Sequence, residues 1–390
     1  MNFNLRDIQN IFLYFYIFSI NFQEVKIFNI ESLSIPKISA FFYFLSILPN
    51  INYFLKIHKN NKSIFAIILF YTILIISNIL NVTISSYSVF DTSMFINIIA
   101  FWIIINHFGI NQHISEKAIL SFSIGSILLS IFYLFNIGVT VSEDSRISLF
   151  GDNENFIGVK MSISIILILF IVFQNNLNLN KLRFILLVPI PIMFKLLIET
   201  GSRVSIISLL LMVILSIYYL KFKNYYIKII LLFFVLVIIF IAFQFVLQNQ
   251  LLLLRLYSSI ENNDIGGREV IFLEIWDKVK YYPILGIGQT GYNVYFGSGS
   301  PHNVFLEIFS YTGILGLVLY LYFLYTIFFI SRTILIRKNK ILPFLLMIPI
   351  SGLLLSGQLL TLKLGWIVFS YVVFHNQFLN EIKYQCTEIK

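Results

Sequence analysis

From Ile229 to Phe243 the chain reads IILLFFVLVIIFIAF, fifteen consecutive residues without a polar side chain. Apolar blocks near 20 residues match the hydrocarbon core of a bilayer, which is about 30 Å thick. Such blocks recur along the 390 residues, of which 58% are hydrophobic and only 12% charged. A soluble domain carries about 25% charged residues, so this chain lacks the polar surface that water requires. The sequence therefore predicts an all-α, polytopic integral membrane protein.

The composition excludes several other classes of protein. Long apolar blocks exclude a secreted soluble domain and a porin-type barrel, whose strands alternate over roughly ten residues. The net charge of +9 is assigned to cytoplasmic loops, so no nucleic-acid partner is expected. The single cysteine, Cys386, excludes an internal disulfide and a cysteine-based metal cluster. We expect no cofactor and no metal site.

The apolar stretches predict about twelve transmembrane helices in a single membrane domain, residues 1–390. They lie near residues 8–22, 35–55, 63–83, 88–108, 117–138, 155–174, 182–199, 202–220, 225–248, 303–331, 341–359 and 362–380. Only Thr200 and Gly201 separate the seventh helix from the eighth, and the alternative is one long kinked helix.

The distribution of charge predicts the orientation of the chain in the membrane. With twelve spans both termini lie on one side. The loops on that side hold 16 Lys and Arg residues against four Asp and Glu, whereas the rest of the chain holds 11 against 14. Because Lys and Arg are enriched in cytoplasmic loops, we expect cytoplasmic termini.

One loop, residues 249–302, is long, and this topology places it outside the cytoplasm. A long loop in a protein of short loops is where function is expected. Apolar residues at helical spacing predict an amphipathic helix near 268–280, lying at the membrane surface.

The same loop contains Gly286-Ile-Gly288-Gln-Thr-Gly291, the glycine spacing of dinucleotide-binding loops. That motif requires a preceding strand in a soluble parallel sheet, which this sequence does not offer. A glycine-rich turn that lets backbone segments pack closely is the better interpretation.

Three arginines on the outer side are candidates for binding a phosphate-bearing ligand. Arg203 begins a helix, Arg268 begins the amphipathic helix, and Arg146 lies in the shorter outer loop 139–155. A guanidinium group binds phosphate oxygens bidentately and stays charged at any relevant pH. The alternatives are an interface anchor or a partner of Glu199 for Arg203, and a solvated loop charge for Arg146.

His302 stands at the predicted start of a helix, in Ser300-Pro301-His302-Asn303. The helix dipole disfavours the imidazolium form there, and a neutral imidazole can accept a proton from a sugar hydroxyl. The alternative is a histidine that only caps the helix.

Several motifs together resemble the O-antigen polymerase and ligase superfamily. They occur in order between about residues 140 and 320: Arg146-Ile-Ser-Leu-Phe-Gly151-Asp-Asn-Glu-Asn155, Thr200-Gly201-Ser202-Arg203, Gly267-Arg268 with Trp276 and Tyr282-Pro283, and Pro301-His302-Asn303 with Glu307, Gly313 and Gly316. The Asn-Pro-Asn that is usual in the superfamily stands here as Asn153-Glu154-Asn155.

The resemblance implies a metal-independent membrane glycosyltransferase with an undecaprenyl-pyrophosphate-linked sugar donor. By the same resemblance Arg203 and Arg268 hold the pyrophosphate and His302 acts on the acceptor hydroxyl. Arg146, Asn155 and Asn303 are the further candidates for binding substrate. The expected location is the bacterial cytoplasmic (inner) membrane, where the partners are membrane lipids, the lipid-linked oligosaccharide and a chain-length regulator protein.

Three functions fit this sequence. The favoured one is a surface-polysaccharide polymerase that joins lipid-linked repeat units. A ligase would use the same chemistry with lipid A core or another acceptor. A flippase for lipid-linked oligosaccharides ranks third, because transporters concentrate binding residues near mid-membrane and this chain concentrates polar candidates on the outer side.

Overall fold

The computed structural model describes residues 4–26, 34–56, 62–81, 92–142, 146–174, 180–219, 268–296, 303–356 and 360–387, with six isolated positions between 226 and 244. The regular secondary structure of the described parts is helical, apart from one short hairpin and an isolated β-bridge between Lys26 and Ser34. The described parts group into two compact units. Unit 1 comprises described residues within Met1–Leu55, Asn106–Leu253 and Asn339–Pro349. Unit 2 comprises those within Lys56–Ile105, Leu254–Lys338 and Ile350–Lys390.

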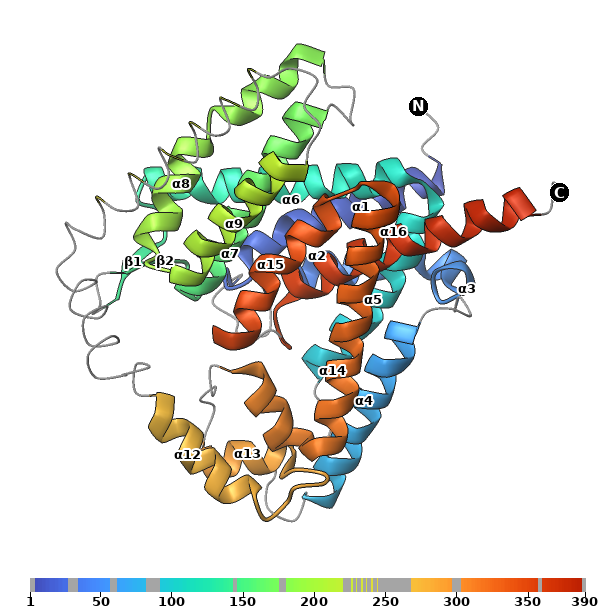
Figure 1. Ribbon diagram of the computed structural model, residues 1–390, viewed down its shortest axis with the longest axis vertical. Helices are drawn as coiled ribbons and strands as arrows, with labels where there is room; N and C mark the ends of the chain where they lie inside the picture. Colours follow the sequence, from blue (N-terminus) through green and yellow to red (C-terminus); the bar gives the residue numbers. More distant parts are fainter. Residues whose placement is uncertain are drawn as a thin grey trace. The chain divides into compact units, whose positions relative to one another are not determined.

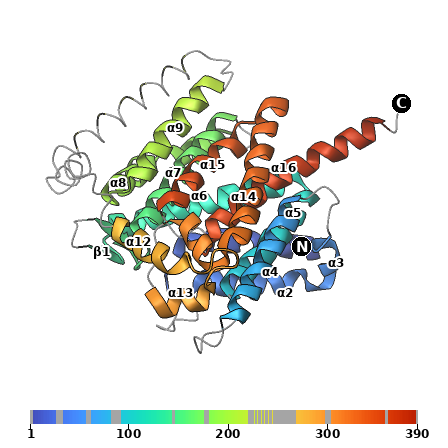
Figure 2. The same cartoon turned by 60° about the horizontal axis from the view of Figure 1, so that its bottom comes forward.

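Unit 1 is a helical bundle that carries a two-stranded hairpin. Its elements are α1 (Leu5–Ser19), η1 (Ile20–Phe22), α2 (Ile35–Ile47), η3 (Leu48–Asn50), α3 (Ile51–Phe54), α6 (Gln112–Leu134), β1 (Val139–Val141), β2 (Ile147–Leu149), α7 (Glu154–Gln174), η5 (Asn180–Leu187), α8 (Ile190–Glu199) and α9 (Arg203–Tyr219). Helix α1 packs on α2 and α6. Helix α7 packs on α6, α8 and α9 (Figure 2). Because most of its side chains are buried, α7 forms the centre of this bundle.

Unit 2 is built on two long helices that run side by side, α4 (Lys62–Leu80) and α14 (Val304–Lys338) (Figure 1). Helices α12 (Arg268–Val279) and α13 (Gly288–Phe296) pack on α14, and α13 also packs on α4. Helix α16 (Lys363–Thr387) packs on α14. Helices α5 (Thr92–Ile110) and α15 (Leu342–Ser356) have residues in both units.

The prediction of a helical, multi-pass membrane protein, which was made from the hydropathy pattern, is confirmed. Among the described residues, five helices have the length and apolar composition of a membrane span, namely Lys62–Leu80, Thr92–Ile110, Gln112–Leu134, Glu154–Phe173 and Val304–Lys338. Two shorter apolar helices are Arg203–Tyr219 and Leu342–Leu355. The number of twelve spans stays a prediction, and the expected span 225–248 lies outside the described residues apart from isolated positions.

Three elements differ from the sequence-based expectation. The predicted span 182–199 begins as 3-10 turns, and only α8 is α-helical; its ten residues rise about 15 Å. The predicted span 35–55 is interrupted by the 3-10 turn η3, which contains Pro49, because proline cannot donate the hydrogen bond that a continuing helix needs. The hairpin of β1 and β2, with Thr140 opposite Ser148, is a small departure from the all-α class.

Candidate functional site

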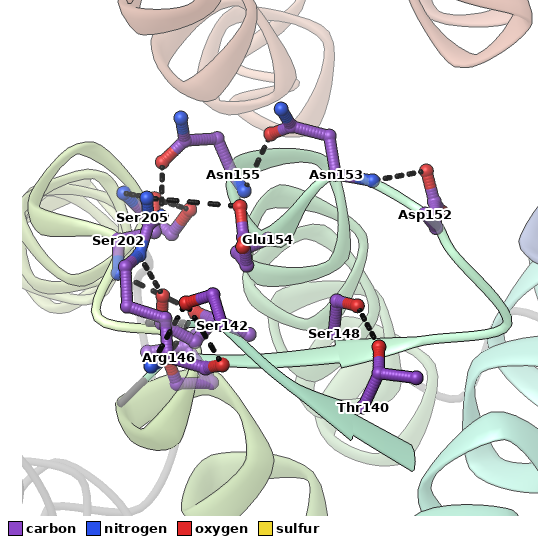
Figure 3. Close-up of polar contacts among 12 residues, drawn as sticks. Thr140, Ser142, Arg146, Ser148, Asp152, Asn153, Glu154, Asn155, Ser202 and Ser205 are labelled. Atoms are coloured by element: carbon purple, nitrogen blue, oxygen red, sulfur yellow. Dashed lines mark hydrogen bonds and ion pairs between the residues drawn. The ribbon is translucent and has the colours of Figure 1, made fainter. Parts of the chain in front are cut away.

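Arg146 is the centre of a polar cluster at one end of unit 1 (Figure 3). Its Nη2 atom donates to Oδ1 of Asn155 at 3.0 Å, and its Nε atom donates to the backbone carbonyl of Thr200 at 2.8 Å. Nη1 lies 3.7 Å from Oε2 of Glu154, and both side chains are about one-fifth exposed, at 22% and 18%. The arginine therefore joins the start of α7 to the turn between α8 and α9.

That turn brings Arg146 and Arg203 to the same end of the bundle. Gly201 adopts φ +61°, and a Cβ there would lie 3.2 Å from Cγ of Arg146, so glycine permits both the turn and the close approach. Arg203 is the first residue of α9 and its side chain is exposed. Arg146 and Thr200, which are 54 positions apart in the sequence, are thus in contact in the fold.

Glu199 does not pair with Arg203, which was one alternative for that arginine. Its Oε2 atom accepts a hydrogen bond from the Tyr133 hydroxyl, and its Oε1 atom lies 3.8 Å from Nζ of Lys195. Within the described ranges no side chain bonds to the Arg203 guanidinium. The guanidinium that the resemblance assigns to pyrophosphate is therefore available on the surface of unit 1.

In unit 2 the glycine-rich turn packs against a break in α14. Gly313 interrupts this helix at φ +61° and ψ −160°. The chain before α13 bonds to the interrupted helix: Ile287 N–H donates to the Ser310 carbonyl at 2.8 Å, and Ile314 N–H donates to the Pro283 carbonyl at 2.9 Å. A Cβ on Gly286 would lie 2.5 Å from the Ser310 carbonyl oxygen. The interpretation of the glycines as a site of close backbone packing is confirmed.

Two polar residues near the end of α4 hold the same region. Ser77 Oγ donates to the Tyr311 carbonyl at 2.8 Å, and Asn78 Oδ1 accepts from Gln289 N–H, also at 2.8 Å. Asn78 thereby satisfies an N–H group in the first turn of α13. Hydropathy did not single out either residue, since an isolated Ser-Asn pair within an apolar helix carries no periodic signal.

The predicted residues of unit 2 differ in how far the structure describes them. Asn303 caps α14, because its Oδ1 atom accepts from the N–H groups of Phe305 at 3.0 Å and Leu306 at 3.1 Å. Arg268 is the first residue of α12. The side chain of Arg268, the whole of His302 and residues 249–267 lie outside the described part of the chain.

Beyond Asn303, the start of α14 contains a buried carboxylate that the sequence reasoning did not assign. Glu307 is 6% exposed and its Oε1 atom accepts from the Tyr311 hydroxyl at 3.2 Å. Tyr292 on α13 packs edge-on against Tyr311, with ring centroids 5.3 Å apart. Burial, together with the Glu307 carboxylate, raises the pKa of Tyr292 to about 12, so this phenol stays protonated at physiological pH.

Two cavities open at the other end of unit 1, away from Arg146. One, of about 420 Å³, is lined by residues that include Arg6, Gln9 and Tyr53; the other, of about 330 Å³, by residues that include Arg6, His113 and Lys117. His113 and Lys117 lie at the start of α6, and Arg146 follows the other end of this helix, whose 23 residues rise about 35 Å. These cavities are therefore not part of the arginine cluster.

Comparison with protein families gives one match. A family model described as O-antigen ligase matches residues 188–321. The matched segment contains α8, α9, α12 and α13 and the first part of α14, so it includes Arg203, Arg268 and His302. The resemblance that the motifs indicate is confirmed over this segment, and members of the family are membrane glycosyltransferase-like enzymes. No curated protein matches the chain.

Proposed function

Because residues 188–321 match a family model described as O-antigen ligase, we propose that this protein is a surface-polysaccharide polymerase. It joins oligosaccharide repeat units carried on undecaprenyl pyrophosphate. The reaction takes place at the outer face of the bacterial cytoplasmic membrane, with both termini of the protein in the cytoplasm.

The proposal rests on the contact between Arg146 and the turn that precedes Arg203. Nε of Arg146 donates to the Thr200 carbonyl, three residues before Arg203, while Asn155 and Glu154 hold the rest of its guanidinium. A guanidinium in a fixed position is preorganised to bind phosphate oxygens. Two arginines at one end of a membrane bundle suit a ligand whose charge lies at headgroup level and whose tail lies in lipid.

These residues suit the departure of a lipid pyrophosphate. As the glycosidic bond to the carrier breaks, negative charge grows on the leaving oxygen, and fixed guanidinium groups stabilise it. Arg203 and Arg268 would bind the pyrophosphate, and the held Arg146 would orient it. His302 would accept the proton of the attacking sugar hydroxyl, a role worth about 10²–10⁴ in rate. Metal independence is part of the proposal and follows from the resemblance.

A ligase is the second candidate, favoured by the description of the matching family. It would use the same donor and transfer the completed glycan to lipid A core or another acceptor. A flippase ranks below both, because the family match is to glycan-transferring enzymes.

Reconstitution tests these alternatives directly. The purified protein in proteoliposomes would receive an undecaprenyl-pyrophosphate-linked repeat unit, with and without lipid A core. We expect a ladder of lipid-linked polymer without core. Transfer to core with no ladder would establish the ligase, and absence of both products with movement of the substrate across the bilayer would establish the transporter. A chain-length regulator, if it binds, would narrow the ladder without being required for it.

A further inference from the structure

A buried ion pair, Lys160 with Asp152, lies in unit 1 close in the chain to the residues that bond to Arg146. Nζ of Lys160, on the second turn of α7, bonds to Oδ2 of Asp152; the exposed fractions of these side chains are 0% and 6%. Nζ also donates to the Asn21 carbonyl at 3.4 Å. A charged residue inside a membrane bundle is costly, so its retention requires a reason.

Stability alone does not supply that reason. The desolvation of two buried charges offsets much of their attraction, and apolar replacements of similar volume are often equally stable. A buried pair of charges does, however, restrict which conformations satisfy both partners. The Lys160–Asp152 pair therefore favours one conformation of the chain around it.

The conformation it selects is a strained turn between β2 and α7. Phe150 has φ +55° and Gly151 has φ +78°, and a positive φ is costly for a residue with a bulky side chain such as phenylalanine. Asp152 follows this turn at once: its N–H donates to the Leu149 carbonyl at 3.0 Å, and its Oδ1 atom accepts from Asn153 N–H at 3.0 Å. With Oδ2 bound to Lys160, Asp152 fixes the turn to the body of α7.

This turn also positions the residue that accepts a hydrogen bond from Arg146, Asn155 (Figure 3). Oδ1 of Asn153 accepts from Asn155 N–H at 2.9 Å, and Oδ1 of Asn155 accepts from Arg146. A continuous series of bonds thus runs from Lys160 through Asp152, Asn153 and Asn155 to the guanidinium.

We infer that Lys160 is a positioning residue for Arg146, acting through the turn 150–155. The inference rests on the proposed function only where donor binding is concerned. The lysine itself contacts no substrate; it holds the turn in the one conformation that presents Asn155 and Glu154 to the arginine.

The test uses the double variant Lys160→Met/Asp152→Asn. It leaves no unpaired buried charge, and the new amide oxygen keeps the bond from Asn153 N–H. The bonds that are lost are those of Nζ of Lys160, to Asp152 and to the Asn21 carbonyl. Ser162→Ala is the matched control, because Ser162 is buried on the same helix and bonds only within it, to the Val159 carbonyl at 3.0 Å.

The first measurement does not depend on activity. Phenylglyoxal modifies accessible guanidinium groups, and mass spectrometry gives its rate at each arginine of the full-length protein in detergent. In the double variant we expect Arg146 to react about tenfold faster, as a locally opened segment would, while exposed Arg203 reacts at an unchanged rate. An unchanged rate at Arg146 in folded protein would overturn the inference.

The second measurement is the KM for the lipid-linked donor, with and without Arg146→Ala. We expect the double variant to raise KM about tenfold on its own, since small misplacements of a binding group have effects of this size or larger. It should raise KM no further in the Arg146→Ala background; additive effects would show that Lys160 acts independently of Arg146. Faster labelling of Arg146 with an unchanged KM would refute the proposed role of Arg146 in donor binding and leave the positioning intact.

Discussion

Asn78 and Gln289 lie 211 residues apart in the chain, yet Oδ1 of Asn78 accepts a hydrogen bond of 2.8 Å from the backbone N–H of Gln289. The bond joins α4 to the first turn of α13. A helix from the first quarter of the sequence therefore holds the start of α13, which lies between Arg268 and His302 in the chain.

Asn78→Ala should loosen α13. Loss of a side chain that satisfies an N–H group at a helix start costs about 1 kcal/mol. We expect faster hydrogen exchange in residues 288–292, measured on the protein in detergent, with little change elsewhere. Thr72→Ala is the matched control, because Thr72 lies on the same helix, is bonded within it and is exposed. Unchanged exchange in 288–292 would show that α13 is held by packing alone.

Gly313→Ala should destabilise the protein. The backbone at φ +61° and ψ −160° belongs to a region that only glycine occupies readily, and strain there costs about 1–3 kcal/mol. The expected result is a lower midpoint of thermal unfolding in detergent. Gly109→Ala is the control, because nothing lies within 4 Å of its Cβ position. Equal midpoints for the two variants would contradict the argument.

Lysine should not replace arginine at positions 268 and 203. It keeps the positive charge but lacks the planar fork that binds phosphate oxygens bidentately. We expect Arg268→Lys and Arg203→Lys to shorten or abolish the polymer at equal protein level, judged by electrophoresis of surface glycan. Normal long chains in both variants would mean that simple attraction to a negative headgroup suffices.

His302→Asn should leave the glycan at one repeat unit while the protein inserts normally. Asparagine preserves hydrogen bonding but is not basic. Since Asn303 already caps α14, loss of the cap cannot explain a defect in this variant. Asn303→Ala provides the comparison: it removes the cap, keeps His302 and should act mainly on stability. Wild-type chain length from reconstituted His302→Asn would refute the general-base role.

Reporter fusions test the predicted topology. A fusion near Tyr295 should report the outer side, and one after Lys390 should report the cytoplasm. The expectation rests on the asymmetry of 16 to four charged residues on the terminal side against 11 to 14 elsewhere. Reporters on a shared side would require an even number of spans between these points and would contradict the predicted topology.

The features that the sequence predicted correctly are those that depend on residues close together in the chain. Apolar runs located α4, α7 and α14. Helical spacing predicted an apolar face of α12 made of Phe272, Ile275, Trp276 and Val279; Ile275 and Val279 are fully buried, whereas Trp276 is 53% exposed. The turn that contains Gly286 was predicted to be a site of close backbone packing, but the sequence did not show that it would meet the backbone around Gly313.

What the sequence could not predict depends on contacts between distant residues. Asn155 owes its position to Arg146 and the turn 150–155, and Lys160 is intelligible only beside Asp152 and Asn21. In the linear sequence Lys160 is a single cation inside an apolar run, and Val139–Val141 is too short to reveal a strand. The residues with which these side chains form bonds are identified only by the fold.

The break at Gly313 divides α14 into a short first part and a longer part of membrane-spanning length. As one straight helix, the 35 residues of α14 would be about 52 Å long, far more than a bilayer core of about 30 Å. The 25 residues from Ile314 to Lys338 rise about 38 Å, a length that fits the core with a tilt within the range of about 0–40° seen for membrane helices. The glycine thus marks a point where the lipid-embedded part of α14 can begin, and the first turns of the helix, which include Glu307 and are capped by Asn303, precede that point. A shift of this glycine by one helical turn would change the length of helix that remains for the lipid by about 5.4 Å, without altering any residue in the segment before α14.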